Sequence, residues 1–176
     1  MQFYLVDRIT SLEAGKSATA VKNLSLAEEY LADHFPGFPV MPGVLMLESL
    51  VQTGAWLMRY TEDFKYSTIL LKQAKALRFN NFVIPGETLN VSVKVHSWVD
   101  QQCVFNAEGT VDGTSAVKAR LTLEQFNLVD SNPALADCDE RSTREFRKQF
   151  TQIWTPEPAG STVSGVEEEM SEEVVG

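Results

Sequence analysis

A histidine, a loop rich in proline and glycine, and a carboxylate on a predicted helix occur within residues 34–48. His34 can exchange a proton near neutral pH, as a catalytic base must. Glu48 interrupts a long apolar run, where burial disfavours the charged form of a carboxylate, so we expect it to hold its proton. The sequence therefore supplies a candidate base and a candidate acid.

Backbone donors and an amide complete this candidate site. Pro42 and Gly43 open the predicted helix, so the N–H groups near Gly43 and Val44 lack intrahelical acceptors and carry partial positive charge. They suit a carbonyl oxygen that becomes anionic during a reaction. Gln52 follows Glu48 by four residues and shares its helix face. Base, acid and oxyanion donors together suit proton abstraction beside a thioester carbonyl, followed by loss of a β-hydroxyl group.

Each residue also has an ordinary structural explanation. Glu48 could be a carboxylate that pairs with a base or faces water. Gln52 could be a buried amide bonded to the backbone, and His34 could be a loop histidine bonded to a carbonyl group. Their joint occurrence around one helix start favours the chemical interpretation.

The surrounding elements predict an α+β fold. From Val44 to Met58 the helix is apolar nearly all round, which predicts a buried helix with sheet wrapped about it. Apolar alternation and turn residues at 13–16 and 112–113 predict antiparallel strands. The expected strands are Phe3–Ile9, Ser17–Leu24, Thr68–Phe79, Leu89–Val95, Cys103–Val111 and Ala116–Phe126. An antiparallel sheet curled around one long central helix is the expected architecture.

Composition narrows the class of protein. The 176 residues carry a net charge of −9, with 13 acids against 11 bases in residues 1–127 and 11 against 4 in residues 128–176. Neither part has the basic excess of a nucleic-acid-binding protein. No signal peptide is visible, and the longest apolar run is too short for membrane insertion, so we expect a cytoplasmic protein. Cys103 and Cys138 lack metal-ligand spacing, and we expect neither metal nor cofactor.

Three regions are expected. Residues 1–127 form the catalytic domain. Residues 128–154 form a C-terminal extension, in which Phe146, Phe150 and Ile153 predict a short amphipathic helix over Ser142–Ile153. Residues 155–176, rich in Pro, Gly, Ser and Glu, are expected to form a disordered acidic tail.

The run HFPGFPVMPGVLMLESLVQ, residues 34–52, resembles the active-site motif of the (3R)-hydroxyacyl-[acyl-carrier-protein] dehydratases of fatty-acid synthesis, with further likeness at residues 4–8, 20–25, 78–79 and 83–87. The resemblance implies a hot-dog fold, with His34 as base for the α-proton and Glu48 as acid for the departing hydroxyl. Gly43 would bind the thioester oxygen, and Gln52 would orient the carboxylate. Aspartate replaces this acid in the related dehydratase–isomerases, so Glu48 favours plain dehydration.

The resemblance also implies partners. The substrate would be a 3-hydroxyacyl chain on acyl carrier protein, and the catalytic pair would come from two subunits of a homodimer, with assembly into a trimer of dimers left open. The chain departs from the family in its N-terminal start, in its long tail, and at Gln73–Leu77, where a Gly-Ile-Asp-like stretch is usual. A second hypothesis is therefore a non-catalytic hot-dog subunit that binds the carrier or completes a heterodimer. Thioester hydrolysis and hydration of a coenzyme A thioester rank lower, because neither needs this motif.

The basic residues nearest the motif have two interpretations. Arg59, Lys65, Lys72, Lys75 and Arg78 are the densest basic stretch. Solvated surface is the preferred interpretation, and a docking patch for an acidic carrier protein is the alternative.

Overall fold

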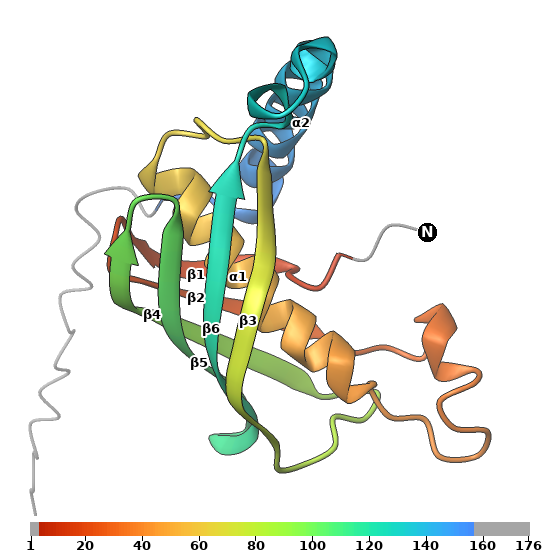
Figure 1. The fold of residues 1–176 in the computed structure, drawn as a ribbon. Helices are drawn as coiled ribbons and strands as arrows, with labels where there is room; N and C mark the ends of the chain where they lie inside the picture. The colour runs from red at the N-terminus through yellow and green to blue at the C-terminus, as the bar shows by residue number, and fades with distance from the viewer. Residues whose placement is uncertain (1–3, 157–176) are drawn as a thin grey trace, which may run out of the picture.

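The computed structural model describes residues 4–156 and has one antiparallel sheet curved around a long helix (Figure 1). The strand order is β1-β2-β4-β5-β6-β3. The strands are β1 Arg8–Glu13, β2 Ser17–Asn23, β3 Thr68–Phe79, β4 Thr88–Val99, β5 Gln102–Val111 and β6 Thr114–Phe126. The helices are η1 Glu29–Leu31, α1 Gly43–Thr61, η2 Leu128–Asp130, η3 Pro133–Leu135 and α2 Ala136–Ile153. The predicted α+β hot-dog fold is confirmed.

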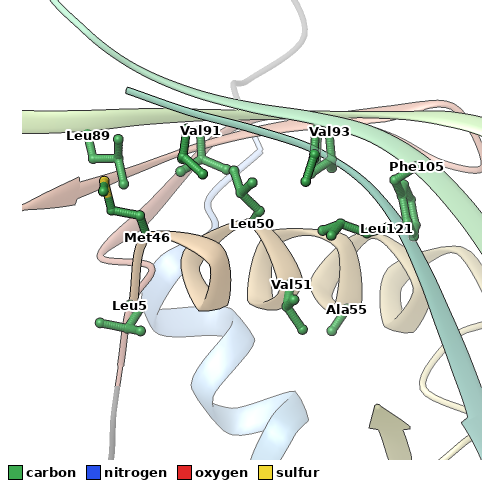
Figure 2. Packing of buried hydrophobic residues seen from close by; sticks show 14 of the residues in the cluster. Leu5, Met46, Leu50, Val51, Ala55, Leu89, Val91, Val93, Phe105 and Leu121 are labelled. Atoms are coloured by element: carbon green, nitrogen blue, oxygen red, sulfur yellow. The ribbon is translucent and has the colours of Figure 1, made fainter. Parts of the chain in front are cut away.

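The core lies between one face of α1 and the sheet. In Figure 2, Leu50 points toward β4, where Val91 lies, whereas Val51 and Ala55 point the opposite way. Leu50 is completely buried, because a sheet curved around a helix covers the helix face that it meets. The predicted burial of α1 on all sides is wrong at its first turn, where Val44 is 68% exposed.

The first strand begins later than predicted. β1 starts at Arg8, which pairs with Val21, and the turn at residues 13–16 sets this register. Asp7 adds one more backbone hydrogen bond to Val21 O, and β2 ends at Asn23, so little of the partner strand remains for earlier residues. The N–H of Leu5 instead donates to the side chain of Gln52.

β3 is an edge strand with two irregularities. Its pairing with β6 shifts between Leu71 and Gln73 and again between Lys75 and Arg78, and Ala76 has a φ of 51°. Apart from Ile69, none of its side chains is buried, and the apolar Leu70 is 55% exposed. A long edge that displays apolar side chains is typical of a strand that another chain covers.

α2 packs across the end of α1 that lies farthest from His34. The helix begins at Ala136, earlier than the predicted Ser142. Phe146 and Phe150 lie against Trp56, with ring centroids 5.9 Å apart in each pair. The carboxylate of Asp139 anchors the start of α2, since it accepts hydrogen bonds from Ser67 Oγ, from Leu128 N at 3.0 Å and from Val129 N at 2.8 Å.

Asp139→Ala should lower the Tm at pH 7, because three donors lose their acceptor. Burial opposes ionisation of Asp139, but the hydrogen bonds from Ser67, Val129 and Leu128 outweigh it and lower the pKa of this carboxyl. A lowered pKa in the folded state gives stability that is present above the unfolded-state pKa and lost as pH falls through the folded-state value. Thermal unfolding followed by circular dichroism should therefore show a Tm difference that narrows toward acidic pH. Asp137→Ala, at an exposed position of the first turn of the same helix, is the matched control; an unchanged Tm for Asp139→Ala would contradict the anchor.

Candidate active site

His34 lies at the start of a loop that closes on itself. Val40 N donates to His34 O at 2.9 Å, and Phe35 and Phe38 exchange backbone hydrogen bonds at 2.9 and 3.1 Å. The His34–Phe35 peptide bond is cis. Proline at two positions of this loop removes donors and fixes φ, so the short backbone ladder holds the histidine at the entrance to α1.

The imidazole of His34 is held in one tautomer. Its Nδ1 lies 2.9 Å from the carbonyl oxygen of Val40. A carbonyl oxygen only accepts hydrogen bonds, so Nδ1 must carry the proton and donate it. In the neutral ring, Nε2 then keeps its lone pair, which is the state that a general base requires.

A cavity of about 360 Å³ lies in front of His34. Gly43 and Met46 of α1 line it, as do Phe79 at the end of β3 and Phe82 from the segment after this strand. A Cβ atom on residue 43 would lie 3.1 Å from the Phe79 ring, so glycine is what lets this aromatic side chain approach the helix start. His34 and Gly43 therefore share one cavity, as a base and an oxyanion donor must.

The first N–H groups of α1 are available to a ligand. Leu45 N and Met46 N both donate to Pro42 O, and Pro42 provides no side-chain cap. Within residues 4–156, no hydrogen bond involves the N–H of Gly43 or of Val44. Two free donors at a helix N-terminus attract a partly negative oxygen.

Glu48 is fixed by Gln52 one turn further along α1. Gln52 Nε2 donates to Glu48 Oε1 at 3.0 Å, and Gln52 Oε1 accepts from Leu5 N at 3.0 Å. The backbone donor settles which end of the amide faces the carboxylate, because the oxygen must meet the N–H group. Glu48 is only partly buried in a single chain, whereas the apolar run around it predicted a buried position.

The structure does not bring His34 and Glu48 together within one chain. Glu48 lines a different cavity, of about 220 Å³, with Val51, Gln52, Ala55 and residues of α2. Each cavity thus holds half of the predicted chemistry: base and oxyanion donors in one, carboxylate and orienting amide in the other. Among residues 4–156, no three His, Cys, Asp or Glu side chains gather as metal ligands, and no helix is long and apolar enough to cross a membrane.

The basic stretch does not act as one surface. Arg59 is 8% exposed and lines the Glu48 cavity, which sequence reasoning missed because the ring that covers it, Phe146, is distant in the sequence. Burial lowers the pKa of Arg59 to about 10. Lys75 and Arg78 instead join Lys118 and Arg120 around a hollow of about 630 Å³ on the sheet.

Comparisons with known proteins identify relatives over most of the chain. Residues 1–120 match the family model of the FabA-like domain. Over 118 residues the chain is 42% identical to the 3-hydroxyacyl-[acyl-carrier-protein] dehydratase FabZ of Latilactobacillus sakei subsp. sakei (strain 23K), covering 67% of this chain and 84% of the relative. The protein of the same name from Janthinobacterium sp. (strain Marseille) is 39% identical over 133 residues, which cover 74% and 85% of the two chains.

Solved structures share the fold at low identity. A chain of the dehydratase heterocomplex ApeI:P from Xenorhabdus doucetiae superposes with a TM-score of 0.62 and 17% identity, over 76% of this chain and 90% of that one. The PaaI protein of the phenylacetic acid degradation operon of E. coli superposes with a TM-score of 0.52 and 12% identity, over 68% and 78%.

Proposed function

The chain belongs to the FabA-like family, and from this membership we propose that it dehydrates (3R)-3-hydroxyacyl groups on acyl carrier protein to trans-2-enoyl groups, as part of fatty-acid or related lipid synthesis. The curated relatives at about 40% identity are 3-hydroxyacyl-[acyl-carrier-protein] dehydratases. The observation that best supports this chemistry is the tautomer of His34, which leaves Nε2 as a base beside two free backbone donors.

In the proposed reaction, Nε2 of His34 removes a proton from C2 of the thioester. The electron pair of that C–H bond forms the C2–C3 double bond as the C3–O bond breaks. Glu48 gives its proton to the departing hydroxyl, which leaves as water. Negative charge that builds on the thioester oxygen is stabilised by the N–H groups of Gly43 and Val44, and Gln52 keeps the carboxyl of Glu48 in place.

A second copy of the chain would complete the site. His34 and Glu48 line separate cavities, so neither cavity of one chain holds both a base and an acid. β3 leaves a long sheet edge, and apolar side chains near the site are exposed, including Phe38 at 53% and Val44 at 68%. A two-fold pair along this edge buries the same surface on both chains, so that His34 of each copy meets Glu48 of the other.

The direct test is to incubate the purified protein with (3R)-hydroxyacyl groups of several lengths on carrier protein and to follow loss of water by mass spectrometry. Dehydration of the (3R) but not the (3S) epimer is expected. A folded protein that turns over none of these substrates would refute the proposal and favour a non-catalytic, carrier-binding subunit.

The basic hollow is the proposed docking site for the carrier, an acidic protein. Arg78 lines the hollow, and the next residue of β3, Phe79, lines the His34 cavity, so one strand contributes to both. Lys118 has only a loose contact with Glu108, at 3.8 Å, and its side chain is 63% exposed. A local positive surface can attract an acidic partner although the whole chain carries net negative charge.

Reversing the two charges on β3 in the double variant Lys75→Glu/Arg78→Glu should raise KM for carrier-bound substrate about tenfold or more, because two attractions become repulsions. The effect should shrink at high salt. KM for the same acyl group on a short pantetheine thioester should change little. Lys65→Glu, which lies at a different cavity, is the matched control; equal effects on both substrates would exclude carrier docking here.

A further inference from the structure

The cavity beside Glu48 continues along the outer face of α1. Glu48, Gln52, Ala55 and Arg59 all line it and recur at the spacing of one helix stripe. At 1.5 Å per residue, Arg59 lies about 16 Å along the helix from Glu48. This distance excludes Arg59 as the ion-pair partner of the catalytic carboxyl and places it at the far end of the cavity.

α2 covers this far end. Phe146 and Gln149 of α2 line the cavity, opposite Ile69 of β3. α2 also lies beyond residues 1–120, the part of the chain that matches the family model. The far wall of the cavity is therefore formed by an element that the matched FabA-like region does not contain.

Arg59 is a buried cation that has no anionic partner among the residues that the structure describes. Its guanidinium carbon lies 3.9 Å from the centroid of the Phe146 ring and 5.3 Å from that of Trp56. Its Nε has no hydrogen-bond partner, and no carboxylate of residues 4–156 lies within 4 Å of its nitrogens. With a pKa of about 10 it still carries its charge at neutral pH.

A buried charge of this kind disfavours binding of an acyl chain that ends in a methyl group. A methyl end placed against the guanidinium would displace water from a cation and offer no acceptor in exchange, which is costly. A carboxylate would pair with the charge and accept directed hydrogen bonds, which are stronger than those between neutral groups. The apolar walls formed by Val51, Ala55 and Ile69 suit the methylene groups in between.

We propose that this cavity receives the distal part of the acyl chain and that Arg59 selects chains that end in a carboxylate. The inference rests on the proposed dehydration and adds a substrate class to it: 3-hydroxyacyl thioesters with an ω-carboxyl group. Arg59 is in this role a specificity residue that contacts substrate far from the reacting atoms.

The test compares matched pairs of carrier-bound substrates, 3-hydroxyoctanoyl and 3-hydroxydodecanoyl groups, each with a methyl or a carboxylate end. For wild type, kcat/KM for the carboxylate member should exceed that for the methyl member by about tenfold or more for at least one length. Arg59→Met should reverse the preference, lowering kcat/KM for the carboxylate member and raising it for the methyl member. Arg59→Lys, which keeps a cation, should retain part of the preference.

Arg147→Met is the matched control, because Arg147 lies on α2 but pairs with Asp63 outside this cavity. Methionine at position 59 replaces an unpaired buried charge with an apolar side chain, so we expect it to fold, which thermal unfolding would verify. Equal kcat/KM for the two ends in wild type, or a preference that survives Arg59→Met, would overturn the inference alone. Turnover of neither member by wild type would instead count against the dehydration itself.

Discussion

Replacing His34 with alanine should lower kcat for dehydration of a carrier-bound (3R)-3-hydroxyacyl group by about 10²–10⁴-fold, the usual contribution of a general base. The hydrogen bond from Nδ1 to Val40 O directs Nε2 to act as the base, and alanine removes it. His96→Ala, at the other histidine of the chain, is the matched control, since His96 is exposed on β4 and should leave turnover unchanged.

Glu48→Gln should cause a loss of the same order. Glutamine keeps the size of the side chain and can still accept the hydrogen bond from Gln52 Nε2, but its amide has no acidic proton to give. Glu62→Gln, at the C-terminal end of α1, controls for the charge change. Circular dichroism and gel filtration should match wild type for every variant. Near-native turnover by a folded His34→Ala or Glu48→Gln protein would refute the assigned roles.

Mixing equal amounts of the two inactive variants should restore about one quarter of wild-type activity, if a two-fold pair builds each site from both chains. After random exchange, half of the pairs contain one copy of each variant. Such a pair has one site with native His34 and native Glu48 and one site with neither.

Subunit exchange must be verified for this result to be decisive. Two affinity tags and mass spectrometry of the co-purified pair would do so, and each variant mixed with itself provides the baseline. Verified exchange without recovery would mean that His34 and Glu48 of the same chain act together, or that no two-chain site exists. A stable monomer at assay concentration would exclude the shared site directly.

The sequence predicted the parts of this protein that local pattern determines. The apolar run behind Pro42 predicted the central helix, and apolar alternation together with the hairpin turns predicted five of the six strands, although β4 extends four residues beyond the predicted end at Val95. The start of the first strand was misplaced because the pattern of residues 3–9 contains no information on where β2 ends, and the end of β2 at Asn23 leaves Leu5 without a strand partner.

The candidate site was also predicted only in part. The four-residue spacing placed Glu48 and Gln52 on one helix face, and the family resemblance implied the contact between them that the structure contains. The burial of Arg59 depends on the ring of Phe146 from α2, and the residues around position 59 cannot predict a contact with a residue so distant in the sequence. The family resemblance implied that His34 and Glu48 act from two subunits, whereas their separation into two cavities of one chain depends on how the loop folds over the helix start.

The two irregularities of β3 affect which other strands can pair with this edge of the sheet. A straight, exposed edge strand is a template for indiscriminate growth, in which any extended segment adds to the sheet and fibres follow. The interruptions at residues 72 and 76–77 in the pairing with β6 bend β3 at two points, so we expect a foreign strand with regular pairing to lose hydrogen bonds at both. A second copy carries the same interruptions. The irregular edge thereby favours self-recognition over aggregation.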